Sequence, residues 1–244
     1  MVLFRVTLFT ILLTLVNGCA NLASAPDKAQ LTNFKHAYIV HLDDPPIGVD
    51  PAFKQVITGS LKYLGPAQLI NSIAALSNLS ESFKQAEIMS KVLTQELNAK
   101  EPWRPTLQLA NIAAKRIEST NLTVAIADNP LKLADNTNKA INAWYNQDGS
   151  ITAYRHLSAD QTTYVLEIFE SNLVYPTALM LEIRMKLIDP ASSAVLGRVR
   201  KWEMVDLPEA ELAFKDNGLI YKETLLATGH KLIRKSLNYL GLVQ

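Results

Sequence analysis

The stretch ALMLEIRMKLID, residues 178–189, constrains the fold most strongly, because its apolar and charged side chains alternate strictly. Apolar residues take every second position and charged residues lie between them: Leu181, Ile183, Met185 and Leu187 against Glu182, Arg184 and Lys186. Successive side chains of a β-strand point to opposite faces of the sheet. The pattern therefore predicts a strand with one buried face and one face exposed to solvent.

Two further stretches beside this one read as strands. TTYVLEIFES, residues 162–171, precedes it, and AVLGRVRKWEM, residues 194–204, follows it. Both are rich in β-branched and other apolar residues. The short connection PASS, residues 190–193, predicts that the second and third strands form an antiparallel hairpin.

Apolar residues at helical spacing predict most of the remaining elements. A first strand at residues 34–42 leads into a helical pattern from Asp50 to Lys100, which Gly65 and Pro66 interrupt. The second helix of this region begins near Ser80. Its predicted apolar side consists of Phe83, Ala86, Ile88, Val92, Leu93 and Leu97.

A third helix, residues 106–120, is expected to turn Leu109, Ile112, Ala113 and Ile117 toward the core and to feed a strand at residues 122–127. A short helix follows around residues 139–145, and residues 215–218 precede an amphipathic helix that runs to Leu240. This order predicts an α+β fold, an α/β sandwich with a mostly antiparallel sheet and helices packed on one face.

The first eighteen residues resemble a secretory signal, with Arg5 before an apolar run at residues 6–16. Residues 16–19, VNGC, resemble the lipobox of bacterial lipoproteins, whose cysteine is acylated and becomes the N-terminus. The resemblance implies a lipoprotein signal peptide at 1–18, an acyl anchor such as palmitate on Cys19, and a flexible tether at 19–33. The alternative is a conventional cleavage site at residues 23–25, ASA, beside a cysteine without an attachment role.

With Ala20 after the cysteine, the resemblance implies the outer membrane of a Gram-negative cell, with a single periplasmic domain at residues 34–244. The chain has 24 lysines and arginines against 23 acidic residues, so its net charge is +1. Nothing in that balance favours nucleic acid, and we expect no nucleic-acid partner. The single cysteine cannot form an internal disulfide.

Candidate catalytic and metal-binding residues are few. His41 and Asp43 have the spacing of two ligands on one strand face, with His36 on the other, but no third ligand is apparent. A serine triad with His156 or His230 would lack both a GxSxG motif and a glycine-rich phosphate loop. We therefore predict no catalytic residue, no metal and no cofactor.

Basic side chains gather on the predicted hairpin: Arg184, Lys186, Arg198, Arg200 and Lys201. They form either a patch for anionic lipid head groups or an acidic partner, or a solvated sheet face on which Glu182 and Glu203 pair with them. Residues 56–79 carry one charge, Lys62, and residues 65–66 split them into pieces too short to span a membrane. They are either core-facing helices or a docking surface.

The run LEIRMKLIDPASSAVLGRVR and a C-terminal helix ending in LNYLGL resemble the periplasmic domains of ABC-transport auxiliary and curli-secretion lipoproteins, over residues 162–244. The resemblance implies a hairpin and a closing helix in a lipid-tethered domain, and it transfers no functional residue. We predict a non-catalytic, lipid-anchored accessory protein of the cell envelope that binds a protein partner or its own copies in transport, secretion or assembly. A carrier or sensor for a small apolar ligand or lipid is the second interpretation, and an envelope enzyme is the third.

Overall fold

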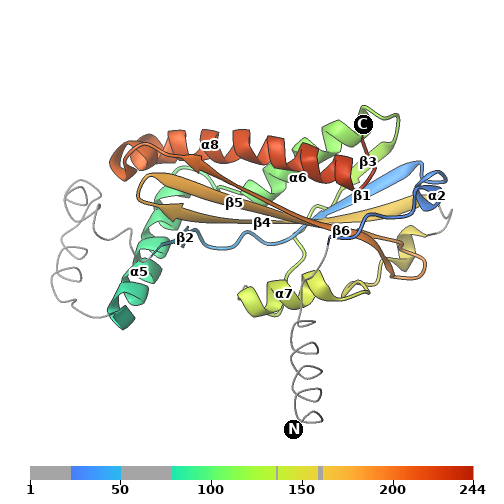
Figure 1. Ribbon diagram of the computed structural model, residues 1–244, viewed down its shortest axis with the longest axis horizontal. Coiled ribbons are helices and arrows are strands. Elements are labelled where there is room, and N and C mark those ends of the chain that lie inside the picture. The colour runs from blue at the N-terminus through green and yellow to red at the C-terminus, as the bar shows by residue number, and fades with distance from the viewer. Residues whose placement is uncertain (1–22, 51–78, 136, 159–161, 244) are drawn as a thin grey trace, which may run out of the picture.

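The computed structural model of the chain describes residues 23–50, 79–135, 137–158 and 162–243, and Figure 1 shows their arrangement. Six strands form one sheet: β1 (His36–His41), β2 (Gly48–Val49), β3 (Thr123–Ile126), β4 (Thr163–Tyr175), β5 (Ala178–Ile188) and β6 (Val195–Asp206). The strand order is β3-β1-β4-β5-β6, and β2 also pairs with β4. The predicted hairpin is confirmed, since β4, β5 and β6 pair antiparallel.

The sheet is mixed, because β1 runs parallel to both β3 and β4, and β2 also runs parallel to β4. Two helices, α5 (Leu79–Leu97) and α6 (Pro105–Glu118), lie between β1 and β3 in the chain. Such a helical crossover lets two strands lie parallel side by side. The predicted α+β class is confirmed. The parallel pairs formed by β1 and β2 were not part of the predicted, mostly antiparallel sheet.

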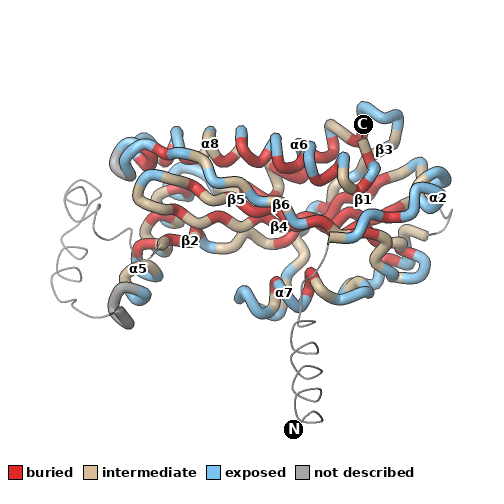
Figure 2. The backbone as a smooth tube through the Cα atoms, in the orientation of Figure 1, coloured by how far each residue is buried: buried red, intermediate tan, exposed pale blue. Residues whose placement is uncertain are grey.

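Helices cover both faces of the sheet. The helices α6 and α8 (Ala210–Tyr239) lie on one face, and α7 (Asn138–Asn146) lies on the other (Figure 1). The main core lies between the sheet and the first pair of helices, where Figure 2 shows the buried residues of α8 turned toward the strands. Its β5 members are the predicted alternating residues Leu181, Ile183, Met185 and Leu187. We call the two sides of the sheet the α8 face and the α7 face.

The prediction of a solvated second face on β5 is wrong for its charged residues. Glu182, Arg184 and Lys186 are buried on the α7 face. The cause is tertiary: α7 packs Ile141, Trp144 and Tyr145 against Phe169 of β4 in a second, smaller core. The predicted position of α7 is itself correct within one residue at each end.

The predicted apolar side of α5 is partly wrong, whereas that of α6 is largely right. In α5, Phe83 and Ile88 are 65% and 41% exposed, and the buried positions are Met89, Leu93 and Leu97. In α6, the expected residues Leu109, Ala113 and Ile117 are all fully buried, and Ile112 is half-buried against the core. In α8, residues 215–218 are non-helical and separate a short first part from the long amphipathic part, which follows Gly218 as predicted.

Residues 23–33, expected to belong to a flexible tether, lie on the folded domain. Ser24 forms an antiparallel bridge with Arg198 of β6, with N–H to carbonyl distances of 2.9 and 2.8 Å. The Tyr239 hydroxyl donates to the carbonyl of Ala23 at 2.9 Å. A short helix, α2 (Lys28–Leu31), follows Asp27, whose carboxylate accepts the N–H of Ala29.

Several predicted features fall outside the described residues. These are the signal sequence, Cys19 and almost all of the apolar stretch at residues 56–79, of which only Leu79, the start of α5, is described. Within the described ranges, no helix combines the length and the apolar character needed to cross a bilayer.

Candidate functional site

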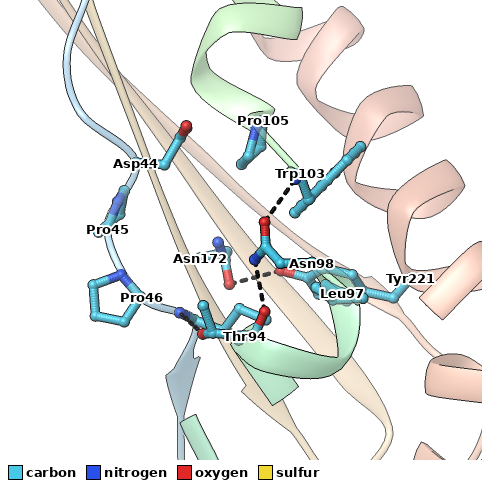
Figure 3. A pocket seen from close by; sticks show the side chains of 11 residues that line it. Asp44, Pro45, Pro46, Thr94, Leu97, Asn98, Trp103, Pro105, Asn172 and Tyr221 are labelled. Carbon is cyan, nitrogen blue, oxygen red and sulfur yellow. Dashed lines mark hydrogen bonds between the residues drawn. The ribbon is translucent and has the colours of Figure 1, made fainter. Parts of the chain in front are cut away.

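A cavity of about 270 Å³ lies where the chain leaves β1, between the sheet and the helices α5, α6 and α8 (Figure 3). It is lined by Asp44, Pro45, Pro46, Ile47, Thr94, Leu97, Asn98, Trp103, Pro105, Asn172 and Tyr221. Sites at the carboxyl ends of parallel strands are common binding positions in sheets covered by helices. We refer to this cavity as the β1 pocket.

One wall of the β1 pocket is the junction between α5 and α6. The Asn98 amide donates to the Thr94 carbonyl at 2.6 Å and accepts the backbone N–H of Trp103 at 2.7 Å. The Trp103 ring in turn lies 5.1 Å from the ammonium group of Lys222. These contacts hold the indole at the rim of the pocket.

The loop after β1 supplies the opposite wall and also caps α6. Asp44 Oδ1 accepts the N–H of Thr106 at 2.7 Å. The helix has Pro105 in its first turn and no cap from the side chain of Arg104, so Asp44 supplies the anion that a helix N-terminus favours. Burial raises the pKa of Asp44, and the hydrogen bonds with Thr106 oppose that rise.

The floor of the pocket is a buried polar chain between β4 and α8. The Tyr221 hydroxyl donates to Asn172 Oδ1 at 2.9 Å, and Asn172 Nδ2 donates to Glu170 Oε1 at 2.9 Å. Burial raises the pKa of Glu170 to about 8, so this carboxyl group is protonated at neutral pH. Its Oε2 has no hydrogen-bond partner among the described residues.

The backbone of α8 comes close to the side chain of Leu97 three residues before Tyr221. Gly218, at φ +69°, packs directly on the side chain of Leu97, and any side chain there would collide with it. Tyr221 then stacks on Phe214 with ring centroids 4.9 Å apart. The pocket thus combines the apolar surfaces of its prolines, Leu97 and Trp103 with hydrogen-bonded polar groups, which suits it to binding a small apolar or aromatic group.

The histidine predicted at the end of the first strand lies buried. Nδ1 of His41 is 3.4 Å from the carbonyl oxygen of Leu42, and burial lowers its pKa. His36 opens β1 and Asp43 follows its end. Across the described parts of the chain, no three His, Cys, Asp or Glu side chains gather closely enough to hold a metal ion.

Four of the five basic residues predicted on the hairpin come together on the α7 face. Lys186 Nζ donates to the Trp144 carbonyl at 2.8 Å, and Arg198 Nη1 donates to the Asn146 carbonyl at 2.9 Å. Arg184 pairs with Glu182 and donates to Asn142 at 2.6 Å. Cations at the carboxyl end of a helix stabilise it, so Lys186 and Arg198 hold α7 against the sheet.

The other two cations at this edge differ in exposure and direction. Arg200 pairs with Glu182 through its Nε at 2.7 Å, and about half of its side chain is exposed. Lys201 points to the α8 face, where its Nζ lies 5.0 Å from the ring of Tyr239. Glu203, expected as a cross-strand partner, pairs with Lys231 and Lys235 of α8.

The β1 pocket did not emerge from the sequence pattern. Its rim comes from two proline-rich connections, DDPPI at residues 43–47 and EPWRP at residues 101–105. Each is recognisable as a turn or linker, but 53 residues, 48–100, lie between the two stretches. Only the parallel pairing of β1 and the crossover to α6 bring them together.

Comparisons with known proteins give distant likenesses of structure alone. No family model and no curated protein matches the sequence. The PelC dodecamer from Paraburkholderia phytofirmans is 13% identical at a TM-score of 0.38, covering 91% of this chain and 96% of that one. The Xanthomonas campestris protein XCC0632, of the family DUF330, is 12% identical at a TM-score of 0.35, covering 89% and 91%.

A putative neuraminyllactose-binding hemagglutinin homolog from Helicobacter pylori is 10% identical at a TM-score of 0.29, covering 89% of this chain and 86% of that one. At such scores these likenesses carry no argument about function. The resemblance of residues 162–244 to ABC-transport auxiliary and curli-secretion lipoproteins stays a prediction.

Proposed function

We propose that this protein is a lipid-anchored accessory protein of the bacterial cell envelope, which works by binding and is held at the periplasmic face of the outer membrane by Cys19. The β1 pocket is the observation that carries the binding function. Its walls come from β4, from three helices and from the loop after β1, and Tyr221 and Asn172 on its floor are hydrogen-bonded to each other.

The size of the pocket favours a protein partner over a lipid cargo. Pockets for drug-sized ligands span about 300–1,000 Å³. At about 270 Å³, the β1 pocket holds one bulky side chain of a partner or a smaller ligand. Well-packed pockets that receive a single anchor side chain dominate many protein interfaces. An apolar or aromatic anchor fits the prolines, Leu97 and Trp103 that surround this one.

Affinity capture after cross-linking in intact cells tests the binding function. We expect Trp103→Ala to reduce capture of a defined partner by at least about tenfold, because it removes one side of the recess. Ile151→Ala, at an exposed apolar residue outside the pocket lining, should leave capture unchanged. Equal capture by both variants would refute the pocket as the binding site, and a small molecule co-purifying in place of a partner would favour the carrier interpretation.

The anchor has its own test. Radioactive palmitate should label the wild-type protein and should not label Cys19→Ser. Equal labelling of the two would refute the anchor while leaving the pocket result untouched.

A further inference from the structure

The α7 face of the sheet is left open along the end of β6. Trp202 and Met204 point to this face from alternate positions of the strand and are 62% and 49% exposed. Met180 of β5 lies opposite Met204 and also lines a hollow of about 440 Å³ on the same face. An exposed tryptophan beside an exposed methionine is unusual on a protein surface in contact with water alone.

The N-terminal segment reaches the domain beside this open end. Ser24 pairs with Arg198 in the antiparallel sense, so the chain approaches residue 24 from the side of Trp202. Cys19 is four residues before Ala23, which places it within about 14 Å of that residue even when fully extended. Arg198 and Trp202 are separated by about 13 Å along the strand, at the rise of an extended chain.

The charged side chains near the open end lie on both faces of the sheet. The side chain of Arg200, two residues before Trp202 on the same face, is about half exposed. Lys231 and Lys235, also about half exposed, lie on α8 across the sheet. The opposing carboxylates are Glu182, which is buried, Glu203, which pairs with both lysines, and Asp206, which is exposed at the end of β6. Tryptophan prefers the head-group region of a phospholipid surface, where its ring is apolar and its N–H finds a partner.

We propose that the end of β6 bearing Trp202 and Met204 lies against the phospholipid surface to which Cys19 is anchored. The proposal rests on the anchor put forward above. A tether of four residues keeps β6 near the head groups, and insertion of the two apolar side chains then fixes which way the β1 pocket faces. The anchored domain is thereby held in one orientation on the membrane.

Spin labels on the acylated full-length protein test this orientation. Because Cys19 is the only cysteine in the chain, Met204→Cys supplies a single free thiol in the acylated protein and leaves Trp202 in place. Leu219→Cys, at an exposed apolar residue of α8 on the other side of the sheet, is the matched control. Each is labelled with a nitroxide and reconstituted into vesicles of phosphatidylethanolamine and phosphatidylglycerol.

We expect the label at 204 to show a several-fold loss of access to a water-soluble nickel chelate, relative to the label at 219, with access to oxygen retained. Adding Trp202→Ala should restore the access of position 204 to the chelate. Equal chelate access at 204 and 219 in palmitate-labelled protein would overturn the docking while leaving the anchor intact. Loss of access to both reagents would also overturn it, because a protein would then cover the patch. Absence of palmitate would refute the anchor and the docking together.

Discussion

Glu167 and Lys186 occupy opposite positions on the paired strands β4 and β5, and both side chains are fully buried beneath α7. The Glu167 carboxylate accepts the indole N–H of Trp144 at 2.7 Å and the hydroxyl of Tyr154 at 2.9 Å. The ammonium group of Lys186 donates to the carbonyl of the same Trp144. The two charges therefore hold opposite ends of one residue of α7 to the sheet.

Replacing Lys186 should destabilise the protein strongly. Lys186→Met leaves the Glu167 charge buried without its counter-charge, and we expect the free energy of unfolding to fall by about 3 kcal/mol. Lys201→Met, on the same hairpin but over the Tyr239 ring, should cost less than about 1 kcal/mol. Urea unfolding of both variants measures the difference. Similar losses in the two would contradict the role of Lys186 in holding α7.

Glu170 should make stability depend on pH. Burial raises its pKa from an ordinary value of 4.5 to about 8, so the folded state keeps a proton that the unfolded state releases. Its contribution is fully present below pH 4.5 and is lost as pH rises through about 8, at up to about 1.4 kcal/mol per pH unit. We expect the stability of Glu170→Gln relative to wild type to rise between pH 5 and pH 8.

Chemical denaturation at several pH values between 5 and 8 measures that trend. Glu87→Gln is the control, because Glu87 is exposed and the pKa of its carboxyl group is lowered by Lys91. Its stability should follow wild type across this range. A constant difference between Glu170→Gln and wild type would show that Glu170 is ionised in the folded protein.

Two buried tyrosines should respond in opposite ways to loss of the hydroxyl. Tyr221 donates to Asn172 on the floor of the β1 pocket, so Tyr221→Phe leaves a buried amide oxygen unpaired and should cost about 1–3 kcal/mol. The Tyr164 hydroxyl, also buried, has no hydrogen-bond partner among the described residues. Tyr164→Phe should therefore be neutral or stabilising. Thermal or urea unfolding of the pair distinguishes these outcomes, and equal losses would contradict the assigned bond.

Gly197 should be required for the contact between the N-terminal segment and β6. A Cβ at this position would lie 2.7 Å from Cδ of Pro26 and 3.0 Å from the Ser24 carbonyl oxygen. We expect Gly197→Ala to cost about 1–2 kcal/mol and to speed hydrogen exchange at the Ser24 amide. Gly149→Ala is the control, since its Cβ would meet nothing nearer than the Ser193 carbonyl oxygen at 3.7 Å. Unchanged exchange at Ser24 in Gly197→Ala would contradict the contact.

Short-range patterns were enough to predict the elements that sequence reasoning found correctly. Strict alternation along β5, the compact connection to β6 and the helical spacing of Leu109, Ala113 and Ile117 each depend on residues within a few positions of one another. The same reasoning failed for Phe83 and Ile88, whose apolar character does not report which side of α5 finds a partner. It also could not foresee that Glu182, Arg184 and Lys186 would be covered.

Alternation and helical periodicity act through neighbouring residues, so the amino-acid order was enough to predict most strands and helices. It was also the basis of the predicted anchor at Cys19. The parallel pairing of β1 and the burial of the cations under α7 depend on the tertiary structure. So does the β1 pocket, whose eleven lining residues are spread along the chain from Asp44 to Tyr221. These features depend on contacts between segments far apart in the chain. Such contacts form only when the strand order and the helix positions are set by packing of the whole core.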